Sequence, residues 1–118
     1  MKPSVRSAIA YVVGAQERAK SAVYDYSTGS YSQFSGNVSP SSVDIYGYED
    51  GCHISGSGSN GNYNLYHYGV GGHIQIQIKG NRFSGFDYSS GDSFSGTRSG
   101  STINIYDYGE GSYFSYSV

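Results

Sequence analysis

The chain has 118 residues, a length typical of one domain, with 7 basic and 9 acidic residues and a formal net charge of -2. This balance excludes the clustered Lys and Arg on which nucleic-acid binding rests, so we expect no nucleic-acid partner. The chain is rich in Gly (18 residues) and Tyr (14 residues), and no stretch is apolar and long enough for a membrane-spanning helix, so we expect no membrane insertion.

Residues 4–22 are predicted to form a helix with Ser4 as its N-cap. Small and apolar residues recur at steps of three and four along one stripe of this segment, whereas charged residues decorate its other sides. A weak signal peptide over residues 1–15 is the alternative interpretation. We favour the structural helix and a cytoplasmic location, with which a single cysteine is compatible. The stripe and the charged residues are Val5, Ala8, Ile9, Val12, Ala15, Ala19 and Ala22, and Arg6, Glu17, Arg18 and Lys20.

Residues 23–118 are predicted to form five hairpin repeats. An aromatic-x-Tyr element occurs five times, the last four copies at a spacing of 20 residues, and turn-forming pairs such as Asn60-Gly61 and Asp50-Gly51 occur every ten residues. Such pairs favour two-residue hairpin turns, because Gly and Asn tolerate the positive φ that these turns need. The resulting fold is all-β, an antiparallel meander of about ten strands that forms a curved sheet or a barrel.

The predicted turns sort the residues onto two faces. Two-residue turns pair Ile45 with Gly56 and Leu65 with Ile76, and they place nearly every aliphatic residue after position 40 on one face. Most of the Ser, Asn, Gln and Tyr residues fall on the other face. We therefore expect the N-terminal helix to pack on or inside the apolar face, where glycines alternate with large residues and permit sharp bending.

The alternative fold is a β-solenoid of 20-residue coils capped by the helix, which predicts the same sequence period. Stacked coils would set Asp87 beside Asp107 at about 4.8 Å on the inner side. Two like charges at that distance in an apolar interior are costly, whereas the meander places Phe94 between them. The meander is therefore the preferred prediction.

No catalytic, phosphate-binding or zinc-binding motif is present, so an enzyme is the less favoured interpretation and no cofactor or metal is expected. Cys52, the only cysteine, follows a turn with no evident base beside it and is interpreted as inert. His53 and His73 are predicted to flank Tyr68 on the polar face. His67, Asp87 and Asp107 fall on the apolar face near one end, where they either form a polar pocket at the barrel mouth or serve as structural caps and ion-pair partners.

The tyrosines are the strongest functional signal. They gather near one end of the polar face, and Tyr combines a large apolar ring with a polar hydroxyl, a pairing common at recognition surfaces. We predict a non-enzymatic binding or assembly protein whose partner is a protein, a glycan or a second copy of the chain. The alternative functions are a small-ligand barrel or an enzyme that uses the polar pocket, and the alternative structural role is aromatic packing that stabilises the sheet. The predicted binding residues are Tyr46, Tyr48, Tyr66, Tyr68, Tyr88, Tyr106, Tyr108 and Tyr113.

Overall fold

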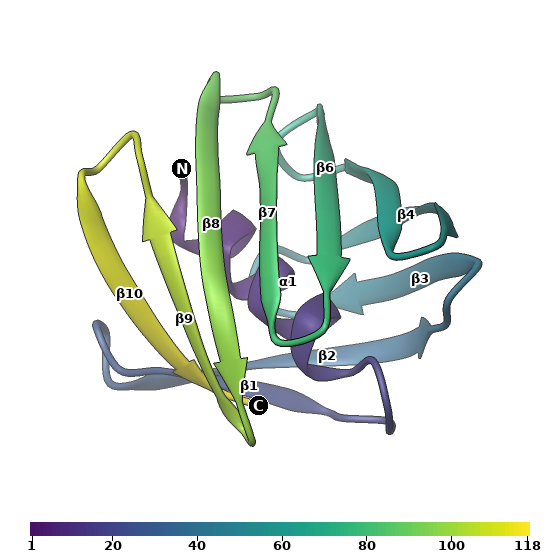
Figure 1. Cartoon of the computed structure of the whole chain (residues 1–118), viewed down its shortest axis with the longest axis horizontal. Helices are drawn as coiled ribbons and strands as arrows, with labels where there is room; N and C mark the ends of the chain where they lie inside the picture. The colour runs from purple at the N-terminus through teal and green to yellow at the C-terminus, as the bar shows by residue number, and fades with distance from the viewer.

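Ten antiparallel strands surround one helix in the computed structural model, which describes all of residues 1–118 (Figure 1). The elements are α1 (Pro3–Gly14), β1 (Ala22–Asp25), β2 (Ser30–Val38), β3 (Ser42–Gly47), β4 (Cys52–Ser59), β5 (Asn62–His67), β6 (Gly72–Lys79), β7 (Arg82–Asp87), β8 (Asp92–Ser99), β9 (Thr102–Asp107) and β10 (Ser112–Ser117). The helix contains no segment long and apolar enough to cross a lipid bilayer.

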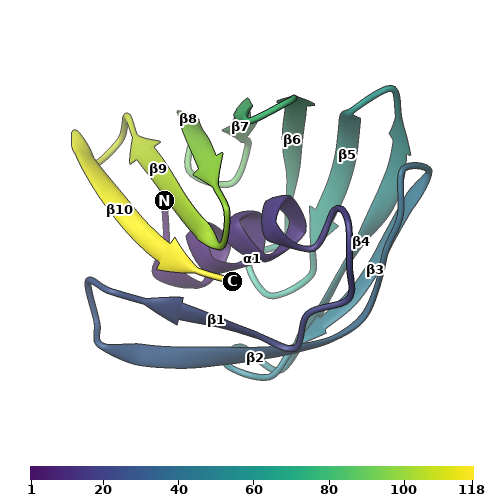
Figure 2. The same cartoon turned by 60° about the horizontal axis from the view of Figure 1, so that its bottom comes forward.

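The strands form a closed barrel in which each strand pairs with its neighbours in sequence. The ring closes where β1 pairs with β10, with Tyr24 opposite Ser117 and Asp25 opposite Tyr116. Figure 2 shows α1, in purple, within the ring of strands. The predicted meander is thus confirmed as a barrel with the helix inside, and the antiparallel pairing excludes the solenoid. Closure removes the free strand edges that would otherwise pair with other chains.

The turns alternate between two kinds, and the sequence predicted only one of them correctly. The β4–β5 turn contains two residues, Asn60 and Gly61, and both have the positive φ that a type I′ turn requires (53° and 81°). The β3–β4 loop instead contains four residues, and in it only Gly51 has a positive φ. The loops that join β5 to β6, β7 to β8 and β9 to β10 also contain four residues.

The longer loops shift the predicted pairing by two residues. Ile45 pairs with Ile54 rather than with Gly56, and Leu65 pairs with Ile74 rather than with Ile76. Side chains alternate between the two faces with a period of two, so a shift of two residues leaves each one on its predicted face. The apolar face predicted from the sequence is accordingly the barrel interior.

The helix is shorter than predicted and is buried on every side. It ends at Gly14 rather than at Ala22, because residues 22–25 form the strand that closes the barrel. Ser4 lies inside the helix, whose N-cap is Lys2. All nine residues from Val5 to Val13 are buried, including Arg6, so the prediction of a single buried stripe was wrong.

The C-terminal end of the helix is held by side chains. Arg98 of β8 donates a hydrogen bond to the Val13 carbonyl at 3.4 Å, and Gln16 donates one to the Val12 carbonyl at 2.7 Å. These contacts satisfy carbonyl groups that have no partner within the helix. This bond gives the Arg98 side chain a partner near the end of α1.

Glycines on the inner face mark the places where strands approach each other most closely. A Cβ atom on Gly56 would lie 1.9 Å from the Asn64 carbonyl oxygen, and one on Gly96 would lie 2.1 Å from the Asn104 oxygen. The Phe83 ring covers Gly96, with its Cζ atom 2.4 Å from the place of the missing Cβ. None of the nearest atoms belongs to α1, so these glycines serve the coiling of the sheet rather than the approach of the helix.

We expect Gly56→Ala to lower the free energy of unfolding by more than about 2 kcal/mol, because the methyl group would force the β4 and β5 backbones apart. Urea denaturation measures this change. Ser57→Ala, on the exposed face of the same strand, is the matched control and should stay within about 0.5 kcal/mol of the parent. Equal stability of the two variants would contradict the proposed role of Gly56.

Candidate functional site

Aromatic rings form a band around the outside of the barrel near the four-residue loops. The last outward-facing residue of an odd-numbered strand packs edge-to-face on the first residue of the loop that follows it, as Tyr66 packs on Tyr68 with 4.8 Å between ring centroids. The same arrangement recurs for Tyr24 with Tyr26, Tyr46 with Tyr48, Phe86 with Tyr88, and Tyr106 with Tyr108. The 20-residue repeat of the sequence is therefore a repeated aromatic pair in space.

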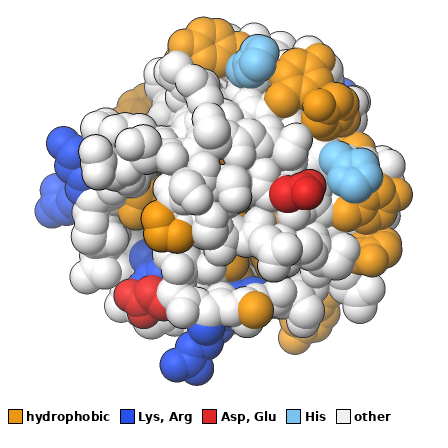
Figure 3. All heavy atoms as spheres, turned by 90° about the vertical axis from the view of Figure 1, so that its right-hand side faces the viewer, with side chains coloured by type: hydrophobic (Ala, Val, Ile, Leu, Met, Phe, Trp, Pro, Cys, Tyr) orange, Lys and Arg blue, Asp and Glu red, His pale blue; other side chains and the backbone are white.

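A third ring joins most of these pairs from the next strand. His53 packs on Tyr46 and His73 packs on Tyr66, each with 4.9 Å between ring centroids. Tyr31 and Tyr113 hold the corresponding places against Tyr24 and Tyr106. The predicted pairing of His53 with Tyr68 is confirmed, since the Tyr68 amide donates to the His53 carbonyl at 3.0 Å. The predicted pairing of His73 with Tyr68 was wrong: His73 pairs with Tyr66, because the β5–β6 loop contains four residues rather than two. Figure 3 shows histidine side chains beside hydrophobic ones on this surface.

The eight tyrosines predicted to bind a partner divide into a half-buried set and an exposed set. Tyr46, Tyr66 and Tyr106 are half-buried, whereas the others are exposed by 55–72%. Several exposed hydroxyls bond to a polar residue 13 positions earlier, as Tyr88 donates to Gln75 Oε1 at 3.1 Å and Tyr48 to Ser35 Oγ at 3.2 Å. These bonds hold the exposed rings across the neighbouring strands. The exposed set consists of Tyr48, Tyr68, Tyr88, Tyr108 and Tyr113.

Shallow hollows with polar floors lie beside the aromatic band. One hollow of about 520 Å³ has the rings of Tyr66, His73 and Tyr88 among its walls. Its floor carries hydroxyl and amide groups from β4, β5 and β6, namely Ser55, Ser57, Asn64 and Gln75. Another hollow, of about 660 Å³, lies beside Tyr108 and is lined by three serines together with Asp92, Phe94 and two glycines. The outer face thus offers aromatic surfaces next to uncharged hydrogen-bonding groups.

Four polar residues that face the barrel interior each occupy the last position of a strand and accept hydrogen bonds from the loop that follows. Asp25, Asp87 and Asp107 each accept a hydrogen bond from a backbone amide two residues later, at 2.8–3.0 Å. His67 occupies the equivalent position in its own repeat, and its Nδ1 atom accepts from the Val70 amide at 3.3 Å. Loop capping is therefore what these inward-facing residues share.

His67, Asp87 and Asp107 are all buried, at exposures of 0–1%, but they do not line one common hollow. A void of about 10 Å³ near His67 is bounded by Asp50, Cys52 and the start of α1. Neither Asp87 nor Asp107 lines this void. That volume has room for one water-sized group. The predicted pocket residues are therefore distributed around the barrel rim, each beside its own loop.

Asp107 forms the main buried ion pair. Its carboxylate accepts hydrogen bonds from Arg6 and from the α-amino group of Met1, both at 3.0 Å. Burial raises the pKa of Asp107, but these bonds to cations outweigh burial and hold the pKa below its usual value. The Arg6 guanidinium also lies 3.7 Å from the centre of the Phe114 ring, so helix and barrel are joined through this cation.

The structure places a base beside Cys52 that the sequence did not predict. The Sγ atom of Cys52 lies 3.8 Å from His67 Nδ1, so a base does lie beside the thiol. Burial raises the pKa of the Cys52 thiol and lowers the pKa of His67, and both shifts favour the neutral forms of the pair. A thiolate nucleophile is disfavoured by these shifts. The sequence signal for this contact was the Asn60-Gly61 turn, which sets the pairing of β4 with β5 and places Cys52 two residues before Ile54, the partner of His67.

We expect Asp107 to make the barrel acid-sensitive. A carboxyl group whose pKa is lower in the folded state stabilises that state above its unfolded pKa of about 3.9, and this stabilisation disappears as the pH falls through the folded pKa. Asp107→Asn should cost about 3 kcal/mol at neutral pH, because it leaves buried cations unpaired. Between neutral and acidic pH, the free energy of unfolding of Asp107→Asn should also fall by less than that of the parent. Urea denaturation at neutral and acidic pH measures both effects.

Asp44→Asn is the control for this prediction, since Asp44 lies on the exposed face of β3. It should retain both the stability and the pH dependence of the parent. If Asp107→Asn kept the parent's loss of stability between neutral and acidic pH, the carboxylate of Asp107 would not be the group responsible.

Comparison of the chain with protein-family models, with curated proteins and with solved structures finds no match. The functional interpretation of this barrel therefore depends on its own surface and its own side chains. The features available for that interpretation are the aromatic band, the polar hollows beside it and the buried groups at the rim.

Proposed function

We propose that the chain is a non-enzymatic glycan-binding protein that uses the aromatic band and the polar hollows beside it. The observation that carries the proposal is the hollow of about 520 Å³ between Tyr66, His73 and Tyr88. Its volume lies within the range of small-molecule sites, about 300–1,000 Å³. Its floor of uncharged hydroxyl and amide groups is the second supporting feature.

This combination fits the chemistry of a sugar. A sugar ring has C–H-rich faces that pack on aromatic rings, and hydroxyl groups around its edge that both donate and accept hydrogen bonds. The side chains of Gln75 and Asn64 each offer a carbonyl acceptor and two N–H donors, and the serine hydroxyls do both. The Tyr88 hydroxyl already bonds to Gln75 at 3.1 Å, which holds the ring beside the polar floor. A neutral glycan is therefore the partner we favour.

The other partner classes have less support. Nucleic acid would need a basic groove, and the chain carries a net charge of -2. An obligate complex with a protein or with a second copy of the chain would bury a more apolar surface, whereas polar hollows border the exposed tyrosines. The alternative of a small-ligand barrel or an enzyme gains no support from an interior void of about 10 Å³.

Binding to insoluble polysaccharides, followed by calorimetry with soluble oligosaccharides of the retained type, tests the proposal. The double variant Tyr66→Ser with Tyr88→Ser should weaken binding at least about tenfold, because it removes both tyrosine walls of the hollow. The matched control is Tyr26→Ser with Tyr31→Ser, which removes two rings exposed by 60% and 73% that do not line this hollow. Thermal melting verifies that both double variants remain folded.

The control variant should keep the parent's affinity. Failure of the parent to bind any polysaccharide, or equal weakening by the two double variants, would contradict the proposal. Sedimentation velocity of the same proteins adds a separate outcome. A concentration-dependent dimer that only Tyr66→Ser with Tyr88→Ser dissolves would show that the hollow serves self-association and would overturn glycan binding.

A further inference from the structure

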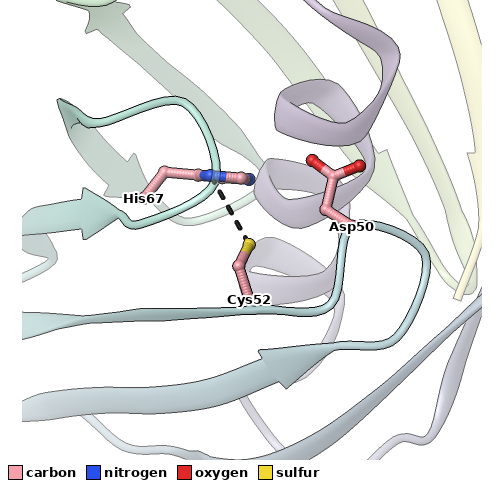
Figure 4. Close-up of side chains that lie close together, drawn as sticks. All are labelled: Asp50, Cys52 and His67. Atoms are coloured by element: carbon pink, nitrogen blue, oxygen red, sulfur yellow. Dashed lines mark hydrogen bonds between the residues drawn. The ribbon is translucent and has the colours of Figure 1, made fainter.

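Three side chains with different metal-ligating atoms converge at the rim of the barrel beneath the β3–β4 loop. Asp50 comes from that loop, Cys52 begins β4 and His67 ends β5 (Figure 4). One carboxylate oxygen, the Sγ atom and one ring nitrogen all lie within 4.8 Å of one another. Asp50 is exposed while Cys52 and His67 are buried, so the cluster extends from solvent to the interior.

The distances approach those of a tetrahedral transition-metal site. Zinc binds Cys sulfur at about 2.3 Å and His nitrogen at about 2.1 Å, and two such ligands in tetrahedral geometry lie about 3.6 Å apart. The Cys52 Sγ and His67 Nδ1 atoms are already 3.8 Å apart. Coordination requires a movement of the exposed Asp50 side chain and release of the Val70 amide from His67 Nδ1. The two buried ligands are therefore nearly in place.

There is room for an ion at this point. The void of about 10 Å³ is lined by Asp50, Cys52 and His67, and also by Ser4, Ser7 and Glu49. Its size corresponds to about one water molecule. The oxygen atoms of Ser4, Ser7 and Glu49 are neighbours that can hold a metal-bound water, the usual fourth ligand of a three-residue zinc site.

The His67 ring presents the lone pair that a metal needs. Its Nδ1 atom accepts a hydrogen bond from the Val70 amide, so this nitrogen carries no proton. The N–N distance of 3.3 Å exceeds the usual 2.9–3.0 Å of a strong N–H hydrogen bond, and the bond is correspondingly weak. This nitrogen has a single lone pair, so a metal ion that binds it on the Cys52 side replaces this weak hydrogen bond.

The cluster occurs at only one place in the repeat. The positions equivalent to Cys52 are Gly72, Asp92 and Ser112, and those equivalent to His67 include Asp87 and Asp107. Gly69 also makes space for the pair, since a Cβ atom there would lie 2.9 Å from Cys52 Sγ and 3.0 Å from the His67 ring. Loop capping accounts for a polar residue at position 67, but it does not account for a thiol and a carboxylate beside it.

We propose that Asp50, Cys52 and His67 bind one borderline-soft divalent transition metal ion, such as Zn²⁺ or Co²⁺. Sulfur, nitrogen and oxygen together match these ions, whereas Mg²⁺ and Ca²⁺ prefer oxygen ligands alone. On binding, the Cys52 thiol releases its proton to solvent and the sulfur bonds to the metal, while a ring nitrogen of His67 and a carboxylate oxygen of Asp50 supply the other two protein ligands. The site is independent of the proposed glycan-binding surface.

Titration of the metal-free full chain with Co²⁺ and with Zn²⁺ tests this site. We expect one Co²⁺ per chain, with a sulfur-to-cobalt charge-transfer band in the near ultraviolet and the visible bands of a tetrahedral ion. Zn²⁺ should displace the Co²⁺ and raise the melting temperature of the parent. Cys52→Ser should abolish the charge-transfer band and weaken Zn²⁺ binding by about 100-fold or more, since removing even a residue that supports a ligand costs 10–100-fold.

Asp50→Asn provides a second variant that keeps the fold, because Asp50 is an exposed loop residue. It should retain the sulfur band while weakening Zn²⁺ binding by about tenfold. The matched control is His53→Gln with His73→Gln, which removes the exposed histidines and should leave binding unchanged.

Loss of binding in that control would place the metal on the outer surface and overturn the proposal. Stoichiometric Co²⁺ binding without a sulfur band, unchanged Zn²⁺ affinity in Cys52→Ser, or no binding to the parent would overturn it as well.

Discussion

The barrel depends on a helix that fills its interior. Nine consecutive residues of α1, from Val5 to Val13, are buried, and small side chains such as Ala8 and Ala10 allow strands to surround the helix on all sides. A ten-stranded ring without this filling would enclose a large space that its own inward side chains could not occupy at protein density. The helix therefore fills the centre of the core, and Arg6 joins it to Asp107 of β9.

The filled interior leaves the outer face and the rim as the surfaces exposed to solvent. The void of about 10 Å³ beside His67 has room for about one water molecule. On the outer face, the same repeat that builds the barrel places an aromatic pair at the end of every odd-numbered strand. Aromatic packing that stabilises the sheet and a surface suited to a partner are thus two consequences of one arrangement.

The strand-end residues at equivalent positions of the repeat differ in their chemistry. Inward-facing residues at the strand ends share a loop-capping role, and Asp87 performs it with two serines of its own loop. His67 performs the same role with a ring nitrogen, which also approaches Cys52. Asp107 adds two cationic partners to its cap. Equivalent positions in the repeat therefore differ in chemistry while they preserve the same backbone geometry.

The amino-acid sequence by itself determined the period, the number of strands and the face on which each side chain lies, because turn residues and alternating polarity are local properties. Only the tertiary structure decided the loop lengths, since Asp50-Gly51 resembles a two-residue turn but lies in a four-residue loop. It also decided where the helix ends, because closing the ring requires residues 22–25 as a strand. The contact between Cys52 and His67 follows from the β4–β5 pairing that the Asn60-Gly61 turn sets, but only the tertiary structure showed how closely the two side chains approach.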